Sequence, residues 1–160
     1  MRKKMIKLGK ATGIVCVIFL GIKKMRDYVV KYKSEAEKYF SLFLMLNQWF
    51  ELKQMGKQTE KFFADRSIKK IAIYGMAQMG ETLYRELEDT GIEVSYGIDK
   101  NAGSLYVHYC KVLKPTDELP QVDAVVVTPL AYFKEIKKDL KRKLSCPIFS
   151  IEDVIYGMTE

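Results

Sequence analysis

Residues 71–80 read IAIYGMAQMG and residues 92–99 read IEVSYGID, and these two stretches decide the fold. The apolar run from Ile71 to Tyr74 predicts a buried strand, and the residues from Gly75 to Gly80 predict a tight turn. A helical run over 78–88 leads to a second predicted strand over 92–98, which ends at an acid, Asp99. This order is typical of a βαβ unit with a phosphate site and a ribose site at one sheet edge.

The rest of the carboxyl-terminal region continues the alternation of strands and helices. Residues 101–115 are expected to be loop-like, with short extended pieces at 105–108 and around Val112. Further strands are expected over 123–127 and at 148–149, with a helix capped by Thr128 that runs to about Lys143. Ser150 and Asp153 form a capping box that opens a terminal helix. The fold class predicted is α/β, a small Rossmann-like doubly wound parallel sheet preceded by a long amphipathic helix and a short hydrophobic helix.

Residues 1–33 form a basic and hydrophobic segment that we interpret as a membrane anchor. Residues 11–22 carry no charge, and basic residues flank them on both sides. A helix over these twelve residues spans only about 18 Å of a roughly 30 Å hydrocarbon core, although flanking lysines extend the effective length by snorkelling. The alternatives are a helix buried against the protein and a secretory signal, which the sequence KKMR at 23–26 disfavours.

Residues 34–66 predict an amphipathic helix that begins at Ser34, where Glu37 completes a capping box, and continues to about Ala64. One apolar stripe follows steps of three and four residues: Leu42, Met45, Trp49, Leu52, Gly56, Thr59 and Phe63. Six further apolar residues widen it: Tyr39, Phe40, Phe43, Leu44, Leu46 and Phe50. Docking of this face on the sheet domain is favoured over a surface for a partner helix, and a homodimer through the helix stays open.

The charge is divided unevenly between the two halves of the chain. Residues 1–70 contain 17 Lys and Arg against 6 Asp and Glu, and residues 71–160 contain 10 against 14. The basic half lacks zinc-finger, homeodomain and RNP-like strings, so an anionic membrane surface is expected as its partner and nucleic acid is not. We therefore expect a membrane-associated protein whose sheet domain, residues 67–160, lies in the cytoplasm.

The candidate ligand site lies at the turn and at the tip of the second strand. Gly75 allows the turn, Gly80 allows close helix packing, and the first-turn amides of the helix favour an anion. Asp99 suits the two hydroxyls of a ribose, and an exposed Asp99 should be replaceable by alanine without unfolding the domain. Ala77 stands where a dinucleotide fingerprint has its second glycine, which moves a phosphate outward. The predicted binding residues are Gly75, Ala77, Gln78, Met79, Gly80, Asp99 and Thr128.

No catalytic group is identified by its spacing. His108, the one histidine, has no carboxylate at a motif spacing, and Lys100 and Asn101 suit either a ligand contact or a solvated turn. The three cysteines, at 16, 110 and 146, form no C-x-x-C pair, so neither a disulfide framework nor a metal site is expected.

From Ile71 to about Asp153 the sequence resembles a sugar-nucleotide module of PglD-like sugar acyltransferases and of membrane-bound nucleotide-sugar dehydratases in surface polysaccharide pathways. The matching segments are IYG at 73–75 with Gly80, YGID at 96–99, Val112 with Pro115, DELP at 117–120, and VDAVVV at 122–127. The resemblance implies that a nucleotide, or a sugar linked to one, binds near the turn and Asp99. The hexapeptide repeats of PglD-like enzymes are not found in the sequence, and Tyr96 with Lys100 straddles a strand end, so it cannot form the dehydratase Tyr-x-x-x-Lys dyad.

Three function classes follow. The favoured one is an accessory or regulatory protein that binds a nucleotide or nucleotide sugar beside glycosyltransferases or other polysaccharide enzymes. The second is an NAD(P)-dependent oxidoreductase or epimerase, and the third is a scaffold with an empty pocket that acts through its helix. The cofactor, whether nucleotide, nucleotide sugar or NAD(P), is left open.

Overall fold

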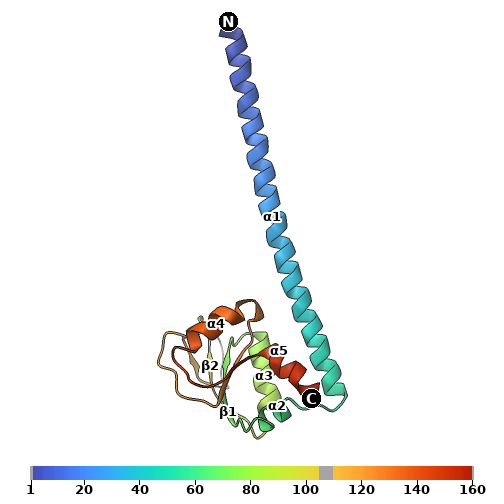
Figure 1. Ribbon diagram of the computed structural model, residues 1–160, viewed down its shortest axis with the longest axis vertical. Coiled ribbons are helices and arrows are strands. Elements are labelled where there is room, and N and C mark those ends of the chain that lie inside the picture. Colours follow the sequence, from blue (N-terminus) through green and yellow to red (C-terminus); the bar gives the residue numbers. More distant parts are fainter. Residues whose placement is uncertain (1, 105–109, 160) are drawn as a thin grey trace. The chain divides into compact units, whose positions relative to one another are not determined.

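The computed structural model describes residues 2–104 and 110–159, with side chains described for 18–104 and 110–158. The chain divides into two compact units, Met1–Leu44 and Met45–Glu160. The described part of the first unit belongs to one helix, and the second unit has an α/β arrangement (Figure 1). The second unit contains every predicted site residue that the structure describes.

The amino-terminal segments form one helix, α1 (Arg2–Gln54), rather than two. The capping box predicted at Ser34 does not begin a helix, because Ser34 lies inside α1 between good helix formers. The prediction of one unbroken helix to Ala64 was also wrong, although a helix does end at that residue. Gly56 adopts a left-handed φ of 75°, and α2 (Thr59–Ala64) follows as a separate helix. Within the part of the chain that the structure describes, no helix is both long and apolar enough to cross a bilayer.

The end of α1 packs on the α/β unit through the predicted stripe. Met45, Trp49 and Leu52 are at most 4% exposed, and the stripe continues into α2 at the buried Thr59 and Phe63. A polar contact closes the edge of this interface, since Lys53 Nζ lies 2.5 Å from an oxygen of Glu86, which also accepts from the Thr59 hydroxyl at 3.0 Å. Over residues 45–63, docking on the sheet domain is confirmed.

Within the described residues, five parallel strands form a sheet in the order β3-β2-β1-β4-β5. They are β1 (Lys70–Tyr74), β2 (Glu93–Ile98), β3 (Val112–Leu113), β4 (Ala124–Val127) and β5 (Ile148–Ser150). The central strands β1 and β4 are almost wholly buried, as expected for strands covered on both faces. The predicted α/β class with a small Rossmann-like parallel sheet is confirmed.

Helices cover both faces of the sheet (Figure 1). On one face, α4 (Phe133–Leu140), preceded by the short η1 (Leu130–Tyr132), packs through Ile136 and Leu140 against Tyr74, Tyr96 and other residues of one hydrophobic cluster. The opposite face is covered by α2, by α3 (Gln78–Leu87) and by α5 (Ile151–Tyr156), which η2 (Gly157–Thr159) follows. The capping box predicted at Ser150 and Asp153 is present and opens α5.

Candidate functional site

The turn after β1 requires glycine at both of its ends. Gly75 has a left-handed φ of 92°, and a Cβ there would lie 2.6 Å from Thr128 Oγ1. A Cβ on Gly80 would lie 2.1 Å from the carbonyl oxygen of Gly75. The turn and the first turn of α3 are therefore in direct backbone contact, and the geometric roles predicted for the two glycines are confirmed.

The amino terminus of α3 is open at the carboxyl edge of the sheet. Its N-cap residue, Ala77, provides no side-chain hydrogen bond, and the first intrahelical bond is donated by Glu81 to the Ala77 carbonyl. Ala77 and Gln78 are exposed, and Met79 is half-buried. The amide groups of the first turn have no partner within the helix, so this end of α3 favours an anion.

Asp99 lies at the tip of β2 but is half-buried rather than exposed. Its Oδ2 accepts from the Met76 amide at 2.9 Å, and its Oδ1 accepts from the Asn101 amide at 2.8 Å. The carboxylate therefore joins the β1–α3 turn to the end of β2. A carboxylate has about four lone-pair positions, so each oxygen retains capacity for a ligand hydroxyl. The expectation that Asp99 is exposed was wrong, since the residue is half-buried and accepts hydrogen bonds from two backbone amides.

Thr128 does not cap the following helix, contrary to prediction. Its buried hydroxyl donates to the Gly75 carbonyl at 2.8 Å and lies 3.2 Å from the Tyr74 carbonyl, and Pro129, not Thr128, is the N-cap of η1. This hydroxyl ties the end of β4 to the end of β1. The Thr128 side chain therefore supports the β1–α3 turn, and its hydroxyl proton is already used in the hydrogen bond to Gly75.

Met76 is a residue that the sequence analysis missed. Its side chain is buried, and a Cβ on Gly97 would meet its Cγ at 2.6 Å. Met76 therefore fills the space that the glycine in β2 leaves open, beside the turn. The signal in the sequence was Gly97, since a glycine inside a strand often marks the close approach of another group.

Two hollows open near the carboxyl edge of the sheet. One, of about 150 Å³, lies between the strand ends and α4, and its lining includes Tyr74, Lys100, Tyr132 and Asp139. The other, of about 490 Å³, lies between η1, the first turn of α4 and the junction of β5 with α5. Burial, with the charges of Asp99 and Asp139, raises the pKa of Tyr74. A tyrosine hydroxyl is protonated at neutral pH even without such a shift, so it can donate to a ligand.

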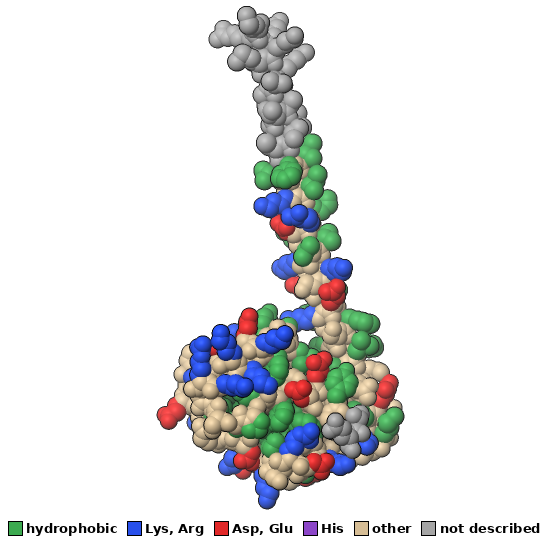
Figure 2. All heavy atoms as spheres, in the orientation of Figure 1, with side chains coloured by type: hydrophobic (Ala, Val, Ile, Leu, Met, Phe, Trp, Pro, Cys, Tyr) green, Lys and Arg blue, Asp and Glu red, His purple; other side chains and the backbone are tan. Residues whose placement is uncertain are grey.

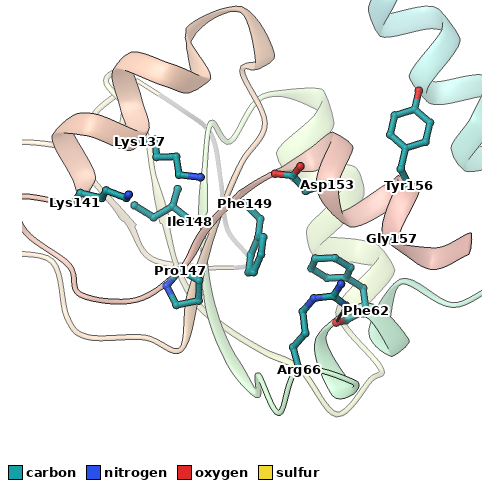
Figure 3. Close-up of a pocket in the computed structure, with 10 residues that line it drawn as sticks. All are labelled: Phe62, Arg66, Lys137, Lys141, Pro147, Ile148, Phe149, Asp153, Tyr156 and Gly157. Atoms are coloured by element: carbon teal, nitrogen blue, oxygen red, sulfur yellow. Dashed lines mark hydrogen bonds between the residues drawn. The ribbon is translucent and has the colours of Figure 1, made fainter. Parts of the chain in front are cut away.

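A further hollow, of about 630 Å³, lies beside the edge strand β5, away from the predicted site (Figure 3). Arg66, Lys137 and Lys141 border it, and the ring of Phe149 packs edge-on against Phe62 at 5.2 Å. Arg66 lies over the Phe62 ring, with its guanidinium carbon 3.9 Å from the ring centroid. Lys137 in α4 and Lys141, the C-cap residue of that helix, are four residues apart, which was the sequence signal for a shared basic face.

Other chemistry-bearing residues add little to the site. The short extended piece predicted at 105–108, which includes His108, lies outside the described residues. Cys110 and Cys146 are half-buried, and burial raises the pKa of both thiols, which disfavours the reactive thiolate. Among the side chains that the structure describes, at 18–104 and 110–158, no group of three potential metal ligands comes together.

Comparison with known proteins adds no relative: no protein-family model, no curated protein and no solved structure matches the chain.

Proposed function

We propose that the α/β unit binds a nucleotide or nucleotide sugar at the carboxyl edge of its sheet. The observation that carries the proposal is the strand order. The connection from β1 leads to β2 on one side, and the later strands β4 and β5 lie on the other side. Ligands of open α/β sheets bind at such a switch point, outside the carboxyl ends of the strands.

The residues at this switch point suit a phosphate next to a sugar. The uncapped amino terminus of α3 offers amide donors to a phosphate, and the remaining lone pairs of Asp99 accept from hydroxyl groups. The hollow beside Tyr74 and Lys100 extends the site along α4. The wider assignment, a membrane-associated accessory protein of surface polysaccharide synthesis, rests on the resemblance of residues 71–153 and on the lysine-flanked run at 11–22.

Thermal unfolding with candidate ligands tests the proposal. UDP, UDP-sugars, NAD and S-adenosylmethionine are compared, and a ligand at a hundred times its dissociation constant stabilises the fold by about 2.7 kcal/mol. Stabilisation by UDP or a UDP-sugar supports the proposal, and stabilisation by NAD supports a dinucleotide enzyme instead. No shift with any of the four contradicts the proposal.

Two substitutions of opposite charge at Gln78 test whether the phosphate of the ligand binds near this residue. Gln78 is exposed in the first turn of α3, so a substitution there leaves the core intact. We expect Gln78→Glu to weaken binding of the ligand severalfold and Gln78→Lys to strengthen it, because the ligand's phosphates are anionic. Equal affinity for both variants would place the phosphate elsewhere, even if the ligand still binds.

A further inference from the structure

Beyond the face that docks on the α/β unit, α1 has a second apolar face. In the first unit it consists of seven exposed positions, here called the heptad stripe: Ile22, Met25, Val29, Tyr32, Ala36, Tyr39 and Phe43. The side chains of Tyr32 and Tyr39 are 63% and 69% exposed. Figure 2 shows hydrophobic side chains along this helix, between the charged ones.

The spacing of the heptad stripe is that of a coiled coil. Its positions follow strict steps of three and four residues over three heptads, which places Ile22, Val29, Ala36 and Phe43 at a and the others at d. None of the charged residues between 22 and 44 occupies an a or d position. The same steps continue at Leu46 and Phe50, which stay exposed while Met45, Trp49 and Leu52 are buried.

We propose that the heptad stripe pairs with the same stripe of a second copy in a parallel, in-register coiled coil. Two identical helices that run parallel and in register place each a residue beside the same a residue of the other copy, and each d residue beside the same d residue. The neighbouring g and e positions agree with this arrangement. They bring Tyr28 beside Lys33 and Glu35 beside Phe40 of the other copy, and no like charges meet.

The apolar area is sufficient for a stable pair. Two copies contribute six aromatic side chains to the pair, namely Tyr32, Tyr39 and Phe43 of each. Burying half of each of these side chains removes on the order of 450–750 Å² of surface from water. The four aliphatic positions of each copy bring the total toward the roughly 1,000 Å² that a specific interface needs. The inference does not depend on the proposed nucleotide site.

The test measures the mass of the full chain in a mild detergent by light scattering with size-exclusion chromatography. We expect about twice the 18.5 kDa chain mass for the unmodified protein. Tyr32→Glu with Tyr39→Glu should halve it, because the charges fall on d positions. Val30→Glu with Leu44→Glu is the matched control, since both residues are exposed and apolar but lie off the stripe, and it should keep the dimer mass.

A crosslinking experiment tests the parallel register. In Met25→Cys a short bismaleimide should join two copies, whereas Asp27→Cys, on the outer face of the pair, and the unmodified chain should not crosslink. Unchanged thermal unfolding of each variant shows that the α/β unit is intact. The proposal is overturned by a monomeric unmodified chain, by a glutamate pair that dissociates no more than its control, or by a dimer that does not crosslink at residue 25.

Discussion

Replacing Asp99 with alanine should destabilise the α/β unit even without a ligand. The Asp99 carboxylate accepts from the Met76 amide at 2.9 Å, inside a part-buried turn, and from the exposed Asn101 amide at 2.8 Å. Alanine leaves the Met76 amide without its acceptor, whereas water can solvate the Asn101 amide. The first loss should therefore dominate the cost.

The size of the effect follows from these two bonds. A hydrogen bond to a charged group contributes about 1.5–3 kcal/mol, so we expect Asp99→Ala to lower the free energy of unfolding by about 2 kcal/mol. Asp99→Asn keeps an oxygen for the Met76 amide but loses the charge, and it should cost about half as much. Asp89→Ala, at an exposed acid beyond α3, should stay within about 0.5 kcal/mol of the unmodified chain.

Urea unfolding followed by circular dichroism and by Trp49 fluorescence measures the effect, because Trp49 is the one tryptophan and lies in the docked end of α1. With the urea dependence usual for small domains, the Asp99→Ala midpoint should fall by roughly 1 M. A midpoint equal to that of Asp89→Ala would refute the reasoning, since it would mean that Asp99 does not hold the turn.

Three further predictions concern a close glycine contact and two ionisable side chains. Gly80→Ala should lower stability by about 1–3 kcal/mol in thermal unfolding, because its Cβ would lie 2.1 Å from a backbone oxygen, whereas Gly21→Ala, with no atom within 4 Å, should slightly raise the helicity of α1. Hydrogen bonds from the Lys69 and Lys70 amides hold the pKa of Asp123 below its ordinary 3.8, so this carboxylate stabilises the fold above that pH and loses its effect as the pH falls. Asp123→Asn should therefore flatten the acid side of a stability–pH profile, and an unchanged acid side would contradict this. Burial raises the pKa of Tyr96 to about 12, so stability should fall as the pH rises from 10 towards 12. Tyr96→Phe should reduce that fall in urea titrations at alkaline pH, and the remainder comes from Tyr74 and Tyr84, whose pKa values are also raised.

The βαβ unit could be predicted from the sequence because its signals are local. The apolar run at 71–74, the paired glycines and the periodicity of 78–88 gave β1, the turn and α3 to within a residue or two. The stripe from Met45 to Phe63 likewise predicted the docked face of α1 and α2. Such signals depend on the spacing of apolar residues and on the local backbone preference of glycine, and both can be read from neighbouring residues in the sequence.

The errors arose where the partner of a polar group lies far along the chain. Thr128 bonds to carbonyls more than fifty residues away, and Asp99 to an amide twenty-three residues away, and no local pattern identifies those partners. The false helix start at Ser34 has a different cause, since a capping-box pattern also occurs inside helices, where the serine faces solvent. Gly56 did contain the signal for the end of α1, but its place in an apolar stripe obscured it.

The two edge strands of the described sheet are short, and this limits further association between copies of the chain. Among the described residues, β3 and β5 flank the sheet, and they contain two and three residues. Strands this short offer an incoming chain very few backbone partners, which is one way in which natural sheets resist edge-to-edge aggregation. When the helices bring two copies together, the described part of their sheets therefore has no long edge strand along which further copies could add. The assembly should stop at a defined size and should not grow into fibres.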